Sequence, residues 1–68
     1  MVNKQLLMAE LVRNGYTQSS FCDKIGIPIS RFNRKLNDRA AFDTTEIKTI
    51  ASELGINDCK LLCDIFLH

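Results

Sequence analysis

The residues from Lys24 to Asn37 include four basic side chains and no acidic one. Exposed helices usually interleave the two signs, because opposite charges three or four positions apart stabilise a helix. An ordinary solvated surface is one interpretation of this segment. The absence of any acidic side chain favours the other interpretation, which is a surface for a polyanionic partner such as a nucleic acid.

The spacing of residue types predicts that residues 29–37 form a helix with two different faces. Its apolar residues are Ile29, Phe32 and Leu36. At about 100° per residue they share one narrow arc, which is expected to face the core. The opposite arc and its flanks hold the polar residues Ser30, Arg31, Asn33, Arg34, Lys35 and Asn37. Such a helix can bury one side and insert the other into the major groove of DNA.

The rest of the chain predicts the helices that hold this segment in place. Apolar residues recur at helical spacing, among them Leu7, Met8, Leu11 and Val12, and no useful alternation predicts a strand. The groups are separated by the helix-terminating residues Gly15, Gly26 and Gly55. Thr17 is a good N-cap, Asp43 and Glu46 form a capping box, and Asn57 is placed to cap the last helix. The sequence therefore predicts an all-α bundle of five short helices, with a third helix opening near Pro28.

The predicted core is formed by aromatic and branched side chains of these helices. Its candidates are Phe21, Phe32, Phe42, Ile47, Ile50 and Leu54. The chain has 68 residues, 46% of them hydrophobic and 25% charged, which fits one small globular domain and argues against disorder. No stretch is long and apolar enough for a membrane span, and the start lacks a secretory signal. We therefore expect a cytoplasmic domain.

The net charge of +1 is unevenly divided along the chain. Residues 1–42 hold seven Lys or Arg against three acids, for a net charge of +4. Residues 43–68 hold two lysines against five acids, for a net charge of −3. The positive part has the charge density that a phosphate-binding face requires.

No arrangement of residues in the sequence points to catalysis or to a bound metal. The three cysteines, Cys22, Cys59 and Cys63, are odd in number and lack CxxC spacing, so we expect small buried or half-buried thiols. The only histidine is His68, which leaves too few ligands for a zinc site. Neither a Ser/His/Asp or Cys/His set nor a Gly-rich phosphate loop is present. We expect no enzymatic activity and no cofactor.

Residues 15–54 resemble the lambda-repressor-like helix-turn-helix family, to which Cro proteins and phage repressors belong. The resemblance depends on Thr17-Gln18, Cys22, Gly26-Ile27, Phe32, Arg34-Lys35 and Asn37. The run FNRKLN, followed by Phe42, Glu46-Ile47 and Ile50, is also similar to small regulators of phages and integrated elements. The family usually has Ala in place of Cys22, and often Ser or Thr where Pro28-Ile29 opens the third helix.

The length predicts a single domain over residues 1–68, and the resemblance implies that its helix-turn-helix lies at about residues 17–37. It implies a transcriptional regulator of the bacterial cytoplasm or nucleoid, or a phage-encoded one, most often a repressor that binds double-stranded DNA sequence-specifically through the major groove. The base-contact positions are Ser30, Arg31, Asn33 and Arg34. The phosphate-contact positions are Thr17, Gln18, Lys35, Asn37 and Arg39. Arg31 and Asn33 can also contact phosphate, and Arg39 can instead pair with Asp38 or Asp43.

The last predicted helix has an apolar arc wider than one core-facing stripe needs. Part of this arc is therefore a candidate homodimer interface, with Leu62, Phe66 and Leu67 as its residues. A two-fold dimer, formed in solution or only on DNA, would match a palindromic operator. The alternative is a helix that packs wholly on its own domain.

A protein-interaction module is the alternative function, in which the same fold binds an anti-repressor or acts as an antitoxin-like partner. The face that carries Ser30, Asn33 and Arg34 separates the two. A DNA regulator depends on Arg34, whereas an interaction module depends more on Leu62 or Phe66.

Overall fold

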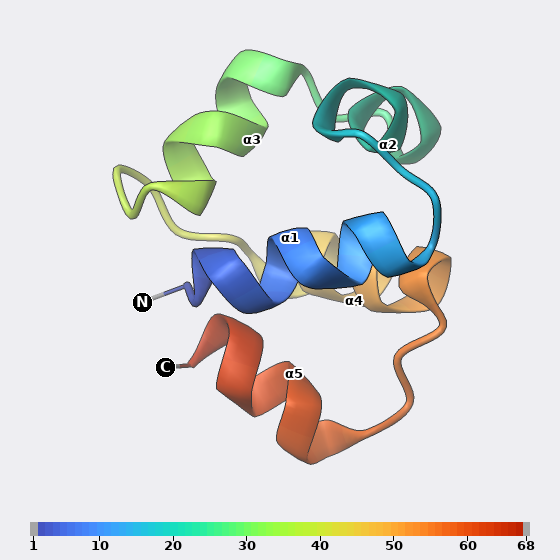
Figure 1. Ribbon diagram of the computed structural model, residues 1–68. Coiled ribbons are helices and arrows are strands. Elements are labelled where there is room, and N and C mark those ends of the chain that lie inside the picture. The colour runs from blue at the N-terminus through green and yellow to red at the C-terminus, as the bar shows by residue number, and fades with distance from the viewer. Residues whose placement is uncertain (1, 68) are drawn as a thin grey trace.

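The computed structural model describes residues 2–67, which form five α-helices and no strand. The helices are α1 (Lys4–Arg13), α2 (Gln18–Ile25), α3 (Ile29–Leu36), α4 (Thr44–Leu54) and α5 (Cys59–Phe66). In Figure 1, α2 and α3 form the upper part of the molecule, with α1 and α4 beneath them and α5 at the bottom. The predicted all-α class is confirmed for this part of the chain, and none of these helices could span a membrane.

Reciprocal side-chain caps fix the starts of α2 and α4. The Thr17 hydroxyl accepts from the Ser20 N–H, and the Ser20 hydroxyl accepts from the Thr17 N–H. Asp43 and Glu46 exchange the same two hydrogen bonds at 2.7 and 2.9 Å. Each box satisfies two backbone donors that a helix start leaves unpaired, so the predicted starts are confirmed.

The start of α5 lies one residue later than predicted. Asp58, and not Asn57, caps it by accepting a hydrogen bond from the Lys60 N–H at 2.9 Å. The physical reason is that a carboxylate caps as well as an amide does and is favoured further by the positive end of the helix dipole.

Gly26 ends α2 in the left-handed region, at a φ of 74°. Its N–H and that of Ile27 both donate to the Cys22 carbonyl, which closes the helix and starts the turn toward α3. The ends of α1 and α4 also have glycines with positive φ, as predicted. At the end of α3, where no glycine stands, Asp38 adopts a φ of 61°, and its carboxylate accepts a hydrogen bond from the Val2 N–H.

The Gly26→Ala variant is expected to lose about 1–2 kcal/mol of folding free energy, because an L-residue with a Cβ disfavours left-handed backbone. An added Cβ would meet no atom within 4 Å, so crowding contributes nothing to that loss. Urea unfolding of the purified variant measures it. Gly26→Asn is the matched control and should lose less, since Asn tolerates this region. An equal loss in both variants would contradict the backbone explanation.

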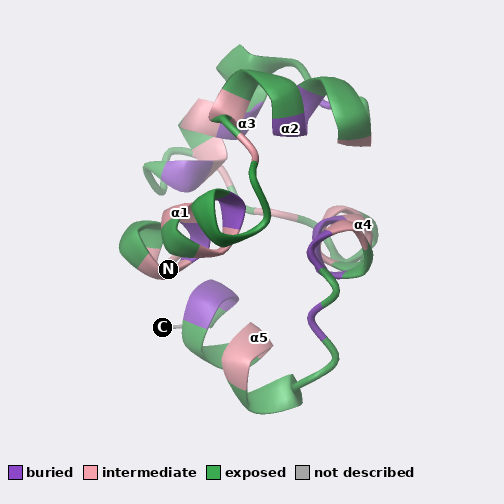
Figure 2. Cartoon of the chain, turned by 45° about the vertical axis from the view of Figure 1, so that its right-hand side comes forward, coloured by how far each residue is buried: buried purple, intermediate pink, exposed green. Residues whose placement is uncertain are grey.

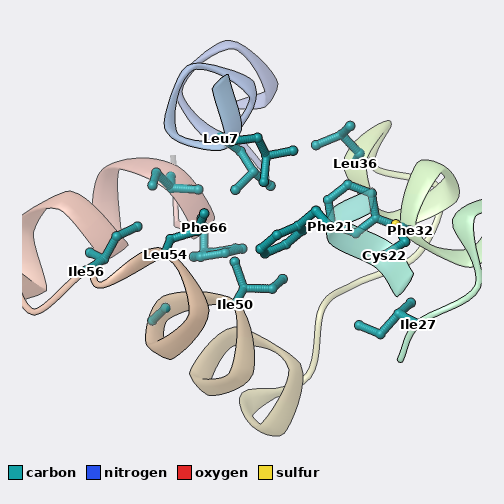
Figure 3. Close-up of a cluster of buried hydrophobic side chains, with 13 residues drawn as sticks. Leu7, Phe21, Cys22, Ile27, Phe32, Leu36, Ile50, Leu54, Ile56 and Phe66 are labelled. Atoms are coloured by element: carbon teal, nitrogen blue, oxygen red, sulfur yellow. The ribbon is translucent and has the colours of Figure 1, made fainter. Parts of the chain in front are cut away.

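One hydrophobic core joins all five helices. Its buried side chains are Leu7, Leu11, Phe21, Cys22, Ile27, Phe32, Leu36, Ile50, Ala51, Leu54, Ile56, Ile65 and Phe66. Figure 3 shows Phe21 in the middle of the cluster, between Leu7 of α1 and Ile50 of α4. Phe42 and Ile47, which were also predicted for the core, are partly buried against it. The remaining core candidates are confirmed as buried.

The four phenylalanines and the one tyrosine of the chain form a continuous series of edge-to-face ring contacts. The series runs Tyr16–Phe21–Phe32–Phe42–Phe66, with ring centroids 5.1 to 6.1 Å apart. Edge-to-face pairs add stability beyond the area that they bury. The series links α2, α3, the loop after α3 and α5, so it fixes the position of α3 relative to the rest of the domain.

The Tyr16 end of this series is bonded to α4. Tyr16 Oη donates to Glu53 Oε1 at 2.9 Å, and this hydrogen bond raises the pKa of Tyr16 above its ordinary value. A raised pKa means that the bond contributes stability below the ordinary tyrosine pKa, about 10, and that this contribution is lost as the pH rises through the shifted value. Thermal unfolding between pH 8 and 11 should therefore show a steeper alkaline loss in the wild type than in Tyr16→Phe. Parallel curves would contradict a stabilising bond.

Two apolar residues of the predicted helices are exposed, and one of them, Ile29, was predicted to face the core. Val12 is 70% exposed and Ile29 is 44% exposed. Ile29 is the first residue of α3, and side chains on a helix lean toward its N-terminus. The Ile29 side chain therefore extends beyond the part of α3 that packs on the core through Phe32 and Leu36. Val12 lies in the last turn of α1, outside the stripe of Leu7 and Leu11.

The expectation for the cysteines holds only for Cys22, which is 2% exposed and whose pKa is raised by burial. Cys59 and Cys63 are exposed. The physical reason is the helical period: Ile65 faces the core from α5, and the two thiols lie on the other side of that helix.

Burial also changes the candidate dimer surface. Phe66 is 7% exposed, and the centroid of its ring lies 5.5 Å from that of Phe42. Phe66 therefore belongs to the core of its own domain, and its prediction as a dimer-interface residue is wrong. Leu62 is half-buried against the same core. Leu67 is 74% exposed because it follows the last turn of α5.

Candidate nucleic-acid interface

The α3 helix lies at the edge of the molecule with its polar side outward. Figures 1 and 2 both show α2 and α3 together at the top, with α1, α4 and α5 on the inner side only. Phe32 and Leu36 attach α3 to the core at 0% and 1% exposure, and buried Ile27 closes the turn that joins it to α2. The outward face is thus presented by a helix whose inner face is packed.

Three of the four predicted base-contact residues are freely exposed on α3. These are Ser30, Arg31 and Arg34, while Asn33 is half-buried. Within residues 2–67, no carboxylate pairs with either Arg31 or Arg34. A free guanidinium offers five N–H donors in a planar fork, which matches the two acceptors of guanine or a phosphate.

Gln18 is the first residue of α2, and its side chain is half-buried. Gln18 Nε2 lies 3.3 Å from the thioether sulfur of Met8. Because a thioether is a weak acceptor, the amide can exchange it for a phosphate oxygen at little cost. Thr17 differs from the prediction, since its hydroxyl is used by the capping box and lies 3.1 Å from the Ser20 hydroxyl. Its side chain has no free donor left for phosphate.

Lys35 also departs from the prediction of a phosphate contact. Its Nζ pairs with both carboxylate oxygens of Glu46 and lies 5.9 Å from the centre of the Phe42 ring. The Lys35 and Glu46 side chains are only 13% and 12% exposed. The reason is tertiary: the acid that caps α4 comes to lie against the flank of α3. Lys35 therefore holds α3 against α4 and presents no free charge to a partner.

The end of α3 gathers polar groups from distant parts of the chain. Asn37 donates from Nδ2 to the Asn33 carbonyl at 2.8 Å and accepts from Lys4 Nζ at 3.2 Å. The amide of Asn37, predicted to contact phosphate, is thus engaged within the domain. Arg39 is exposed, and among residues 2–67 it forms no ion pair with Asp38 or Asp43.

Lys4 is a candidate phosphate contact that sequence reasoning missed. It precedes Asn37 by 33 residues, and only the packing of the N-terminal segment brings its ammonium to the end of α3. The Asn3 N–H donates to the Ile65 carbonyl at 2.6 Å, which holds that segment in place. Lys4 and Arg39 therefore add positive charge at the end of α3 opposite Ile29.

The Glu46→Gln variant is expected to lose about 1–2 kcal/mol of folding free energy, because it leaves the mostly buried Lys35 ammonium without its carboxylate. Urea unfolding of Glu46→Gln, Lys35→Met and the double variant measures the coupling between the two residues. We expect the double variant to lose less folding free energy than the two single variants lose in sum. Additive losses would show that the pair contributes nothing.

Comparison of the chain with models of known protein families, with curated proteins and with solved structures found no match. Within residues 2–67, no group of three or more His, Cys, Asp or Glu side chains could hold a metal ion. The function is therefore inferred from the chain's own geometry.

Proposed function

We propose that residues 17–37 form a helix-turn-helix and that the protein binds double-stranded DNA sequence-specifically, with α3 in the major groove. The observation that carries the proposal is the outward face of α3, where Ser30, Arg31 and Arg34 are exposed and both guanidinium groups are unpaired. The Glu46 carboxylate near this face is neutralised by Lys35, so the positive charge of the arginines dominates.

The dimensions of α3 support this use. An α-helix with its side chains is about 10–12 Å across, which fits the major groove, about 12 Å wide, and the eight residues of α3 lie in one regular helix. In such complexes the N-terminal residues of the inserted helix contact base edges, while neighbouring elements contact phosphate. We expect Gln18 at the start of α2, and Lys4 and Arg39 near the end of α3, to contact the phosphates.

The biological role that follows is transcriptional regulation, most simply repression by a small phage-type regulator that occupies an operator and blocks polymerase. Such a protein acts in the bacterial cytoplasm, where the DNA is.

A homodimer is part of the proposal, because two copies would match a palindromic operator. Because Phe66 is buried in the core, the remaining candidates for the contact between the two copies are Leu67 and the half-buried Leu62. Leu67 is 74% exposed and lines an open groove whose other walls include Phe42 and Ile47. Formation on the DNA alone would suffice for function.

Selection from a random duplex pool by the purified protein tests the proposal. We expect recovery of one short half-site, repeated as a palindrome, and an affinity that falls steeply as salt rises. Absence of salt-sensitive duplex binding even at low ionic strength would contradict DNA binding and leave the same fold free for a protein partner.

A further inference from the structure

The α3 helix begins with a large apolar side chain that its own domain does not cover. Among residues 2–67, the exposed large hydrophobic residues are Val12, Ile29 and Leu67. Of these three, only Ile29 lies on α3. It directly precedes Ser30, which is on the outward face of that helix. A helical wheel alone would bury it, so its 44% exposure is a consequence of its place at the helix end.

We propose that Ile29 contacts the 5-methyl group of a thymine and so selects an A·T pair at that position of the operator. This inference rests on the proposed DNA binding, and it assigns a base preference to a residue that has no hydrogen-bonding group. The methyl group of thymine is the distinctive apolar feature that the four bases present in the major groove.

The shape and position of Ile29 suit that contact. Its Cβ is branched, so the side chain has few rotamers and loses little conformational freedom when it is covered. Pro28 precedes it with a φ of −56°, and its ring fixes that angle, so the backbone that leads into Ile29 is rigid. Contact with a methyl group removes apolar surface of both partners from water.

Asn33 extends the same preference along the groove. Residues four apart lie on one ridge of a helix, so Asn33 stands one turn behind Ile29. Within residues 2–67 the side-chain amide of Asn33 has no hydrogen-bond partner. The main-chain carbonyl of Asn33 accepts a hydrogen bond from the Asn37 side chain. An asparagine amide pairs with the N6 and N7 atoms of adenine. The ridge of Ile29 and Asn33 is therefore suited to neighbouring A·T pairs, one recognised by its methyl group and one by its adenine edge.

Replacing thymine by uracil tests the contact, because it removes the methyl group and leaves base pairing intact. The probe is the duplex that the wild type recovers from the random pool, resynthesised with one thymine at a time as uracil. We expect about a threefold to tenfold loss of wild-type affinity at one thymine in each half-site, the size expected for one methyl group. The Ile29→Ala variant should bind the thymine and uracil duplexes equally at that position.

Ser30→Ala is the matched control, since it changes the neighbouring side chain and should keep the discrimination. Circular dichroism of each variant establishes that it is folded, and Ile29→Val, which keeps the branched Cβ, should keep part of the effect. The inference would be overturned, while DNA binding stands, if the wild type bound every uracil duplex as tightly as the thymine duplex. It would also be overturned if Ile29→Ala still distinguished thymine from uracil as the wild type does. Failure to recover any duplex would overturn the proposed function and this inference with it.

Discussion

Replacing Arg34 by alanine is expected to weaken binding to the selected duplex by about 5- to 150-fold. Arg34 is exposed on the side of α3 opposite Phe32, and its guanidinium forms no ion pair within residues 2–67. A bidentate contact between its guanidinium and guanine contributes about 1–3 kcal/mol of discrimination, which corresponds to that loss. The preference at the contacted base pair should relax in the same variant. Fluorescence anisotropy with the selected duplex and its single-base variants measures both effects.

Two controls make the Arg34 result specific. Lys60→Ala removes the same charge from the exposed face of α5 and should leave affinity nearly unchanged. Lys35→Ala removes a charge from α3 itself, but that charge is neutralised by Glu46, so its effect should be on folding stability instead of the salt dependence of binding. Equal losses in Arg34→Ala and Lys60→Ala would mean that only net charge matters, which contradicts a specific contact.

Replacing Phe32 by alanine is expected to remove a large part of the folding free energy of the domain. Phe32 is fully buried and stands in the middle of the aromatic series, between Phe21 and Phe42. Loss of a buried phenylalanine ring costs about 3–5 kcal/mol, whereas a chain of this length has about 3–10 kcal/mol of stability in total. Circular dichroism and urea unfolding of the purified variant measure the effect.

Ile29→Ala is the control for Phe32, because both are large apolar residues of α3. Since Ile29 is 44% exposed, its truncation should cost much less than that of Phe32. Similar losses in the two variants would show that Ile29 packs in the core after all and would remove the basis for its role in base selection.

The predictions that depend on neighbouring residues agree best with the structure. Thr17 and the Asp43–Glu46 box start their helices as expected, because capping signals act within three residues. The outward position of Ser30 and Arg34 also follows from helical periodicity alone. Periodicity fails at the helix ends, as Ile29 shows, because a wheel treats the first residue as if neighbouring helices covered it.

The features that sequence reasoning missed depend on contacts between distant residues. The partner of Lys35 is Glu46, eleven residues away, and the partner of Asn37 is Lys4, 33 residues away. Neither pairing leaves a local signal, so Lys35 and Asn37 could not be distinguished from free polar side chains. Their engagement within the domain moves the expected phosphate contacts to Gln18, Arg39 and Lys4.

The packing around α3 also bears on how a complex would form. The aromatic series and the Lys35–Glu46 pair hold α3 from two sides before any partner arrives. A recognition surface that is already in place loses little conformational entropy on binding. Binding should therefore leave the five helices unchanged.

A titration of ¹⁵N-labelled protein with the selected duplex, followed by amide chemical shifts, tests the location of the DNA most directly. We predict that the largest chemical-shift changes fall on residues 29–34, with smaller ones at Gln18, Lys4 and Arg39, and that the amides of α5 change only where two copies meet. Changes centred on α5 and the groove beside Leu67, with the amides of α3 unaffected, would contradict this prediction.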